Sequence, residues 1–216
     1  MKILVLGATG MAGHTISLYF LERGHDIVAF SRTPFKYCEN IIGNITDFGK
    51  LEKTVKIGQY DAIVNCIGIL NQHAEDNKDT AVLLNSYLPH FLATITRNTA
   101  TKIVHMSTDC VFSGERGSYT EADFADGRTF YDRSKALGEL NDNKNITLRN
   151  SIVGPDINAN GIGLFNWFMK QTQTINGYSK AIWTGVTTLT LAKAMEQAIE
   201  KNISGLINLA NNDTID

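Results

Sequence analysis

The chain has 216 residues, a hydrophobic fraction of 43% and a formal net charge of −2 at pH 7. This length suits one domain with a small appendage, and the near-neutral charge excludes a global attraction to nucleic acid or to anionic membranes. No apolar run is long enough to span a bilayer and no signal peptide is evident, so neither nucleic acid nor a membrane is an expected partner.

The residue types that most often ligate transition metals show no metal-binding spacing. The cysteines are odd in number, and two lie in apolar strand contexts, which favours free thiols in a reducing cytoplasm, the expected location. They are Cys38, Cys66 and Cys110. Core or surface positions are expected for the histidines, which are His14, His25, His73, His90 and His105. We therefore expect no metal site.

The chain opens with an apolar strand at residues 2–6, followed at once by a glycine-rich turn. The turn, 7–13, has the spacing G-x-x-G-x-x-G and leads into a helix predicted over 11–23, with Gly24 as its stop. Glycines let the backbone approach a pyrophosphate, and the helix N-terminus offers unpaired N–H groups to that anion. The spacing differs from the G-x-G-x-x-G dinucleotide motif, but its place between a strand and a helix favours cofactor binding over a purely structural turn.

A second strand, predicted at 26–30, ends in Ser31 and Arg32. An acidic residue at this point binds the ribose 2′-hydroxyl of NAD, whereas a small hydroxyl residue with an arginine suits the 2′-phosphate of NADP. The sequence therefore favours NADPH, with NADH as the alternative. A second interpretation stays open, in which Arg32 is only a solvated loop charge.

The predicted elements up to the middle of the chain alternate between strand and helix. They are a strand at 40–44, a helix at 47–57 capped by Asp47 and stopped by Gly58, a strand at 61–67 that runs into Gly68, a polar loop at 71–79, and a long helix to about residue 98. Asn85 lies within the long helix, either as a satisfied core amide or as a cofactor contact.

The centre of the chain holds the residues that point to chemistry. An apolar strand at 102–106 ends in Ser107 and Thr108, as a buried parallel strand does when it delivers polar groups to a ligand. Tyr131 and Lys135 lie four residues apart on one face of a predicted helix. An ammonium group beside a phenol lowers a tyrosine pKa that is normally about 10, so such a tyrosine can exchange a proton with a carbonyl or hydroxyl oxygen.

The Tyr-x-x-x-Lys pair is weak evidence by itself, because it arises by chance on many solvated helix faces. The glycine-rich opening, the strand that ends in hydroxyl residues and the alternating strand–helix pattern strengthen it. Thr108 could hold the same substrate oxygen by a hydrogen bond. The three residues together predict a proton-transfer site.

The last part of the chain continues the alternation. Its predicted elements are a strand at 145–149, a turn at 150–155, an aromatic-rich helix at 162–171, a capped helix at 187–201 and a strand at 205–210. Trp167 and Phe168 are expected in the core. The whole pattern predicts an α/β fold with a doubly wound, Rossmann-type parallel sheet, helices on both faces and ligands at the carboxyl edge.

The sequence resembles the extended short-chain dehydrogenase/reductase superfamily and, within it, the dTDP-4-dehydrorhamnose reductases. The resemblance runs from Gly7-Ala-Thr-Gly-Met-Ala-Gly13 to Gly205-Leu-Ile-Asn-Leu209. Its most specific segments are Ser107-Thr-Asp-Cys-Val-Phe-Ser-Gly114, Tyr119-Thr-Glu-Ala-Asp123 and Tyr131-x-x-Ser-Lys-Ala-Leu-Gly-Glu139.

The resemblance implies NADPH-dependent reduction of a nucleotide-linked 4-keto-6-deoxysugar in the synthesis of cell-surface polysaccharide precursors. Tyr131 would protonate the sugar C4 oxygen as hydride arrives from the nicotinamide. Lys135 would bind the nicotinamide ribose and hold the tyrosine pKa down, and Thr108 would orient the carbonyl. A nucleotide sugar is the expected small-molecule partner, and a homodimer is the assembly to be tested. Residues 1–150 would form the NADP-binding domain, and 151–216 a substrate lobe interleaved with the last strand.

The expected ligand contacts fall just after the strands and in the central motif. Cofactor-binding residues are expected to be Gly7, Thr9, Gly10, Met11, Gly13, Ser31, Arg32, Asn44, Ile45, Cys66, Ile67, Gly68, Asn85, Tyr131, Lys135 and Ser151. Substrate-binding residues are expected to be Ser107, Thr108, Asp109, Cys110 and Arg149.

The chain departs from the family pattern at two positions in these segments. Cys110 stands where the family usually has tyrosine, beside the implied substrate pocket, so the identity of the sugar is left open. Asp132 stands where the family has glycine, and its negative charge beside Tyr131 opposes ionisation of the phenol. The chain also ends sooner than family members do, so we expect the substrate lobe to be incomplete.

Other functions on the same fold were weighed against this one. One is a sugar-nucleotide epimerase or 4,6-dehydratase, but the related dehydratases use an acidic pair after the threonine, and here Asp109 is followed by Cys110. Another is a non-catalytic NADP-binding regulatory subunit, because a fold does not fix a function. The intact set of Thr108, Tyr131 and Lys135 argues against that second alternative.

Overall fold

The computed structural model describes residues 1–158 and 163–215. Its main sheet consists of seven parallel strands in the order β3-β2-β1-β4-β5-β6-β9. The strands are β1 Lys2–Leu6, β2 Asp26–Ser31, β3 Glu39–Ile42, β4 Ala62–Asn65, β5 Lys102–Thr108, β6 Ile146–Asn150 and β9 Gly205–Asn208. The order runs outward in both directions from β1 and β4, so the crevice at their carboxyl ends is the topological switch point where such sheets bind ligands. The predicted doubly wound parallel sheet is confirmed.

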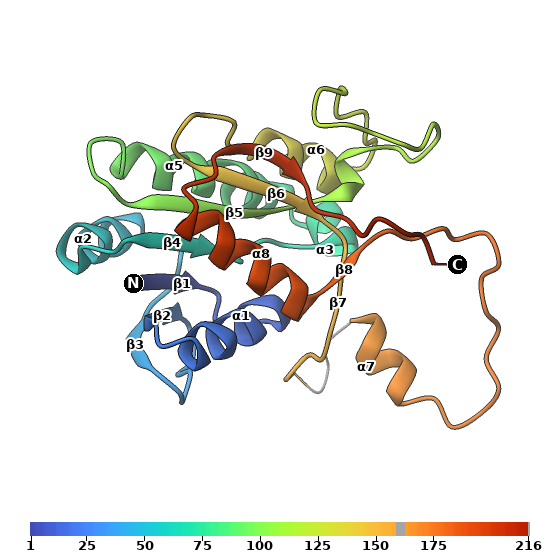
Figure 1. Cartoon of the computed structure of the whole chain (residues 1–216), viewed down its shortest axis with the longest axis horizontal. Helices are drawn as coiled ribbons and strands as arrows, with labels where there is room; N and C mark the ends of the chain where they lie inside the picture. Colours follow the sequence, from blue (N-terminus) through green and yellow to red (C-terminus); the bar gives the residue numbers. More distant parts are fainter. Residues whose placement is uncertain (159–162, 216) are drawn as a thin grey trace.

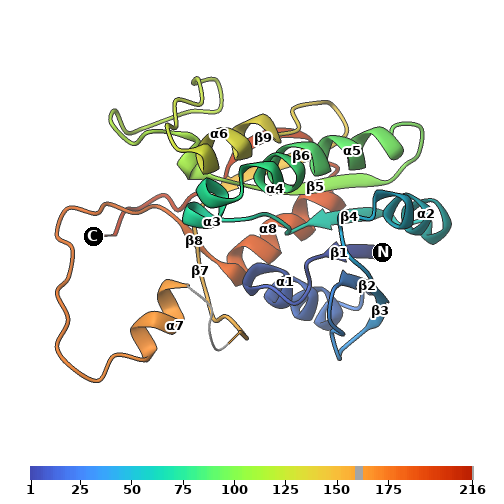
Figure 2. The same ribbon diagram turned by 180° about the vertical axis from the view of Figure 1, so that it is seen from behind.

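Helices cover both faces of this sheet (Figure 1, Figure 2). One face carries α1 (Met11–Glu22) and α8 (Thr188–Glu200), and the other carries α2 (Phe48–Gly58), α5 (Leu88–Ile95) and α6 (Phe130–Leu137). Because both faces are covered, the central strands β1 and β4 are almost wholly apolar rather than alternating, whereas the edge strand β3 is partly exposed.

Strand β1 shows how the core is divided between the two faces. Ile3 and Val5 belong to the cluster packed under α1 and α8, whereas Leu4 and Leu6 belong to the cluster under α2 and α5. Successive side chains of a strand point to opposite faces, and all four are fully buried. The strand therefore fixes the middle of the molecule and delivers the following glycine turn to the carboxyl edge.

Helix α2 begins as predicted but ends one residue later. Asp47 is the N-cap, and its carboxylate accepts a hydrogen bond from the Lys50 N–H at 2.9 Å. The predicted stop at Gly58 is wrong, because Gly58 lies inside the helix and Gln59 takes the left-handed conformation, with φ 49°. A side chain at Gly58 would collide with the ring of Tyr60, so this glycine serves close packing rather than chain reversal.

The region predicted as a polar loop at 71–79 contains two short helices, α3 (Asn71–Asp76) and α4 (Lys78–Ala81), so that prediction is wrong. The predicted long helix is also divided, by a π-helical turn, η1 (Val82–Tyr87), that precedes α5. The sequence of these helices is mostly polar, so it shows no clear apolar periodicity. Each helix buries one small residue, Ala74 in α3 and Ala81 in α4.

A proline accounts for the π-helical turn. Pro89 has no N–H to give to the carbonyl of Asn85, four residues earlier. The neighbouring Leu88 N–H instead bonds to the carbonyl of Leu83, five residues earlier. The Asn85 carbonyl is left facing Gly138, where any side chain would strike it. The widened turn thus brings the η1 backbone against the end of α6.

The C-terminal part differs from the prediction in two places. The predicted turn at 150–155 contains a short strand, β7 (Ile152–Val153), which pairs in parallel with β8 (Val186–Thr187). The aromatic-rich helix appears as α7 (Leu164–Met169), while residues 159–162, where its predicted start falls, lie outside the described residues.

Helix α7 stands apart from the sheet in Figure 1 and buries none of its residues. Trp167 is 46% exposed and Phe168 is 57% exposed, so the expectation that they belong to the core is wrong. By contrast, α8 is capped as predicted, since the Thr187 hydroxyl accepts from the Thr190 N–H at 3.0 Å. No helix within the described residues has the length and apolar character needed to cross a membrane.

Candidate active site

The glycine-rich turn forms a cradle of bare backbone at the start of α1. Gly7 has φ 84°, a conformation that side chains rarely adopt, and a side chain at Gly13 would collide with the Gly7 carbonyl. The Gly10 N–H bonds to that same carbonyl at 3.0 Å, and no side chain of the described residues caps the helix start. Unpaired helix N–H groups and backbone without side chains fit a dinucleotide pyrophosphate. The half-buried Thr9 and Met11 border the cradle.

The turn after β4 packs against this cradle. A side chain at Gly7 would touch the Ile67 side chain and the backbone of Cys66, so the two turns adjoin at the switch point. The Ile67 N–H is held by the Asn65 side-chain oxygen at 3.1 Å, and Gly68 is exposed beyond it. These predicted cofactor residues are therefore brought together by the sheet order.

The predicted contacts for the adenosine end lie after β2 and β3. Ser31 is buried and donates its hydroxyl to the Thr33 carbonyl at 2.6 Å. Arg32 is exposed and pairs with no acidic side chain of the described residues. Asn44 is exposed in the loop after β3, whereas Ile45 is buried in the core. Arg32 is thus a cation free to meet an anion.

Asn85 is a buried amide that connects two parts of the site. Its side-chain oxygen accepts from the Ile69 N–H at 2.9 Å, and its nitrogen donates to the Ile69 carbonyl and to the Ser134 hydroxyl, both at 3.0 Å. This arrangement favours the core-amide interpretation of Asn85. It also holds Gly68 near α6: a side chain at Gly68 would lie 3.8 Å from the Lys135 Nζ.

Helix α6 positions the two central candidates. It begins with a capping box, in which the Thr129 hydroxyl accepts from the Asp132 N–H at 3.1 Å and the Asp132 carboxylate accepts from the Thr129 N–H at 2.9 Å. Tyr131 and Lys135 then follow on the buried side of the helix, with 7% and 4% exposure. The Lys135 ammonium donates to the carbonyl of Met106 in β5 at 2.7 Å, which joins the helix to the central strand.

The phenol of Tyr131 meets the end of β5. A hydrogen bond to Thr108, itself buried, acts on the phenol. The Thr108 hydroxyl also accepts from the Cys110 N–H at 3.1 Å, which fixes its orientation. Thr108, Tyr131 and Lys135 therefore lie together at the carboxyl edge of the sheet, where the sequence pattern placed them.

The pKa of Tyr131 moves in the direction opposite to the one expected. Burial raises this pKa above its ordinary value, the hydrogen bond to Thr108 only partly opposes the rise, and the charges of Asp109 and Asp132 add to it. The net rise thus differs from the lowered pKa that the sequence predicted, whereas Asp132 opposes ionisation of the phenol as predicted. Burial also lowers the pKa of Lys135 to about 8, with Glu139 as the main opposing charge.

A second buried network lies beside these residues. Glu139, just after α6, accepts from Arg149 through Nε at 2.8 Å and through Nη2 at 2.7 Å, and from the Ser107 hydroxyl at 2.8 Å. Ser107 and Arg149 were predicted as substrate contacts, whereas Glu139 was not singled out. Its only sequence signal is its place at the end of the segment that begins at Tyr131.

A cavity of about 930 Å³ opens next to this network. One wall carries Asp109 and Cys110, directly after Thr108, and the opposite wall comes from the segment 180–185 before β8. Ser151 also lines the cavity, with its hydroxyl accepting from the Trp183 indole N–H at 2.7 Å.

Aromatic rings and cations complete the cavity wall. Phe112 and Tyr119 stack with centroids 4.4 Å apart, Arg149 lies over the first ring and Arg116 over the second. Arg116 and Lys180 add positive charge at the lining. A cavity with flat rings, cations and polar groups suits an anionic ligand that carries a base and a sugar.

Comparison with known proteins agrees with this geometry. The family model of the RmlD substrate binding domain matches residues 1–214. Among curated proteins, the probable low-salt glycan biosynthesis reductase Agl14 of Haloferax volcanii is 31% identical over 143 residues, covering 64% of this chain and 48% of the relative. A dTDP-4-dehydrorhamnose reductase of Mycobacterium tuberculosis is 27% identical over 144 residues, covering 64% of this chain and 44% of the relative.

The solved structures extend the likeness to the whole chain. The crystal structure of a hypothetical dTDP-4-dehydrorhamnose reductase from Sulfolobus tokodaii has a TM-score of 0.86 and 25% identity, covering 100% of this chain and 78% of that one. The matched segment spans about half the length of the curated relatives. Given a family match across almost all of its residues, the chain belongs to the RmlD substrate binding domain family.

Proposed function

We propose that the protein is an NADPH-dependent reductase of a nucleotide-linked 4-keto-6-deoxysugar, acting in the synthesis of cell-surface polysaccharide precursors. The observation that carries the proposal is that Thr108, Tyr131 and Lys135 are all buried around the carboxyl end of β5, directly before Asp109 and Cys110, which line the cavity. The names of the relatives, which include a glycan biosynthesis reductase and several dTDP-4-dehydrorhamnose reductases, support the same chemistry.

A nicotinamide cofactor, held by the glycine cradle and by Lys135, supplies the hydride when bound. Thr108 holds the C4 carbonyl oxygen of the sugar by a hydrogen bond. Tyr131 gives its phenol proton to that oxygen, so that one hydride at carbon and one proton at oxygen convert the ketone to an alcohol. The buried position of both residues keeps water from competing for the carbonyl oxygen.

The raised pKa of Tyr131 fits the role of general acid in the proposed reduction. A phenol that stays protonated near neutral pH is ready to act as the acid, whereas oxidation of an alcohol would require a phenolate as the base. The sequence predicts a pKa lowered towards the phenolate, whereas burial raises the pKa and favours the protonated phenol. The bound cofactor would add its own charges to this balance.

Cofactor choice is the finer part of the proposal. Arg32 is exposed at the end of β2, where the adenosine ribose of a cofactor in the cradle would lie, and the described residues hold no carboxylate against it. A free guanidinium at this point suits the additional phosphate of NADPH.

The test is an NADPH-oxidation assay over a panel of nucleotide-linked 4-ketosugars, with dTDP-4-dehydrorhamnose as the first compound. We expect one compound to consume NADPH at a clear rate with formation of the C4 alcohol. Binding of NADPH without turnover of any compound would instead favour the regulatory-subunit alternative. Exchange of hydrogen at sugar carbons without net reduction would favour an epimerase.

A further inference from the structure

Arg149 has one guanidinium nitrogen that none of the described residues engages. Its Nε and Nη2 are taken by the Glu139 carboxylate, while Nη1 is shielded from solvent and makes no hydrogen bond. The side chain as a whole is 5% exposed and lines the cavity. An unpaired buried donor costs about 1–3 kcal/mol, so a ligand that supplies an acceptor here gains affinity.

Asn208 provides the complementary atom. It is the register partner of Arg149 across β6 and β9, and it lines the same cavity. Its Nδ2 donates to the Tyr119 carbonyl at 3.2 Å, and because a carbonyl only accepts, the other amide atom must be the oxygen. This Oδ1 is shielded and makes no hydrogen bond with the described residues.

The pair consists of one unused donor and one unused acceptor on neighbouring strands. An anion would satisfy Arg149 Nη1 but would face the lone pairs of Asn208 Oδ1, and Glu139 already neutralises the Arg149 charge. A hydroxyl group accepts one hydrogen bond and donates another, so a single hydroxyl has the bonding capacity that these two atoms lack. The pair therefore matches a neutral hydroxyl better than a phosphate or a carboxylate.

The position of the pair in the sheet indicates which hydroxyl of the ligand it would bind. Ser107, next to Thr108, is the register partner of Arg149 across β5 and β6, so Arg149 lies one strand away from Thr108 and Asn208 lies two strands away. Lys180 of the same cavity, for which no ion pair is found among the described residues, is the cation suited to the diphosphate, whereas Arg116 is paired with Asp123 at 2.6 Å.

We propose that Arg149 and Asn208 form a specificity pair that binds a ring hydroxyl, at C2 or C3, of the sugar whose C4 carbonyl is reduced. This inference rests on the proposed function and names the part of the substrate that the site reads. It predicts that a sugar lacking that hydroxyl is rejected because both atoms are then left unpaired.

The experiment measures binding by calorimetry, with NADP present, so that no turnover is needed. The ligands are dTDP-rhamnose and its 2-deoxy and 3-deoxy counterparts. We expect the wild-type protein to bind one deoxy compound about 10- to 150-fold more weakly than dTDP-rhamnose, the scale of one hydrogen bond to a charged group. In Arg149→Lys, which keeps the charge beside Glu139, and in Asn208→Ala, this preference should fall to within about threefold of unity.

Asn143→Ala, an exposed asparagine away from the cavity, is the control and should keep the full preference. Equal affinity of the wild-type protein for all three ligands would overturn the inference and leave the proposed function standing. The inference would also be overturned if the variants bound all three ligands more weakly by the same factor. The pair would then have a structural role, for example in holding a buried water. If no nucleotide sugar binds while NADP does, the proposed function itself has failed and the specificity pair falls with it.

Discussion

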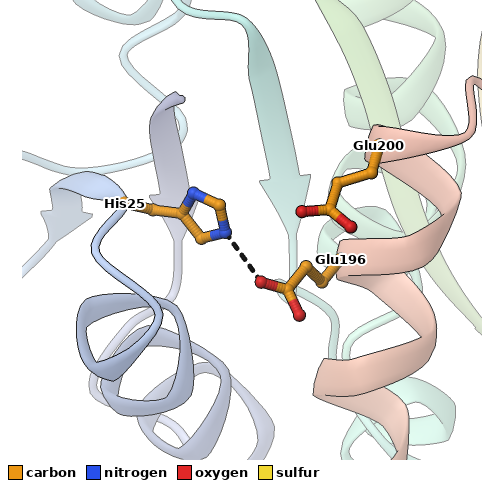
Figure 3. A group of neighbouring side chains, drawn as sticks. All are labelled: His25, Glu196 and Glu200. Carbon is orange, nitrogen blue, oxygen red and sulfur yellow. Dashed lines mark hydrogen bonds and ion pairs between the residues drawn. The ribbon is translucent and has the colours of Figure 1, made fainter.

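Two glutamates, Glu139 and Glu196, are buried in different parts of the molecule, and the comparison separates a candidate site from a structural clamp. The Glu139 side chain is 8% exposed and the Glu196 side chain 6% exposed. Glu196, on α8, accepts from the Tyr19 hydroxyl at 2.6 Å and from Arg23 at 3.1 Å. It also accepts from His25 at 2.9 Å, and Figure 3 shows this bond. Each carboxylate thus receives three donors, and the Glu139 network borders the cavity of about 930 Å³, which Glu196 and its partners do not line among the described residues.

The hydrogen-bond partners of the two carboxylates differ in their surroundings and in whether they retain a buried, unpaired donor. Arg149 retains an unused nitrogen beside the cavity, whereas the partners of Glu196 join the end of α1 to α8. His25, Glu196 and Glu200 also have the spacing of a metal site, with ligand atoms within 4.8 Å of one another. Arg23 occupies the same Glu196 oxygen as His25, and a guanidinium there opposes a cation. A buried carboxylate is therefore a functional candidate where its partner lines a cavity and keeps a buried donor unpaired, as Arg149 does.

The largest expected effect separates chemistry from stability. Tyr131→Phe removes one oxygen from a buried ring, so turnover should fall by about two to four orders of magnitude, the usual scale for a positioned general acid. Cofactor affinity and the thermal midpoint should stay close to wild type. The measurement is steady-state NADPH oxidation together with NADPH titration.

Tyr37→Phe is the matched control, because that tyrosine is 48% exposed, and it should leave turnover unchanged. A Tyr131→Phe protein that turns over at nearly the wild-type rate would remove this residue from the mechanism.

Glu196→Gln should show the reverse pattern. Replacing the carboxylate weakens hydrogen bonds from charged partners, so the free energy of unfolding should fall by about 1–3 kcal/mol while turnover changes little. The measurement is denaturant unfolding. Glu200→Gln, one turn later and exposed, is the control and should have almost no effect. A large loss of turnover in folded Glu196→Gln would show that Glu196 is not only structural. A thermal midpoint of the wild-type protein that drops when a chelator is added would also contradict the structural assignment, because it would indicate a bound metal.

The Glu196 effect should depend on pH with a definite sign. Burial raises the pKa of Glu196, but hydrogen bonds from Tyr19, His25 and Arg23 outweigh it, so the pKa is lowered overall. A lowered carboxyl pKa contributes stability above the unfolded pKa of about 4.3, and this contribution is lost as pH falls through the folded pKa. The difference in stability between wild type and Glu196→Gln should thus narrow in acid. A difference that grows in acid would contradict this assignment.

Lys135 predicts how turnover at the candidate site depends on pH. Because burial lowers its pKa to about 8, turnover should fall as pH rises through about 8 and the ammonium loses its proton. Lys135→Arg, whose guanidinium stays charged, should shift that decline to higher pH. Unfolding provides an independent check: the unfolded lysine holds its proton to higher pH, so wild type should gain stability relative to Lys135→Met between about pH 8 and 10. A turnover profile without a decline in either protein would exclude the charge of Lys135 from the mechanism.

The smallest expected effect concerns Arg32. Because this arginine is exposed, Arg32→Ala should weaken NADPH binding by only about 3- to 10-fold and leave NADH binding unchanged. Titration of both cofactors measures it, with Lys36→Ala, another exposed cation, as the control. Equal losses for both cofactors would mean that Arg32 does not read the 2′-phosphate.

Motifs with a fixed local geometry were predictable from the sequence. The apolar run before Gly7, the Asp47 and Thr187 caps, and the spacing of Tyr131 and Lys135 each depend on a few neighbouring residues. Their locations in the fold follow from the strand order, which alternation of strands and helices restricts strongly.

Features that depend on distant partners were not predictable. Trp167 and Phe168 have core-forming side chains, but the described residues place nothing over α7 that buries them. Gly58 has the composition of a helix stop, yet Tyr60 gives it another role.

The sequence by itself determined the parallel sheet, the glycine cradle and the set of Thr108, Tyr131 and Lys135, because these follow from local periodicity and residue chemistry. Only the tertiary structure decided the direction in which the pKa of Tyr131 shifts and the place of Glu139, since burial and hydrogen-bond partners set both. It alone also left Arg149 Nη1 and Asn208 Oδ1 without partners beside a cavity. A pKa shift and the lack of a hydrogen-bond partner both depend on the neighbouring residues, and here those neighbours come from strands that are far apart in the chain.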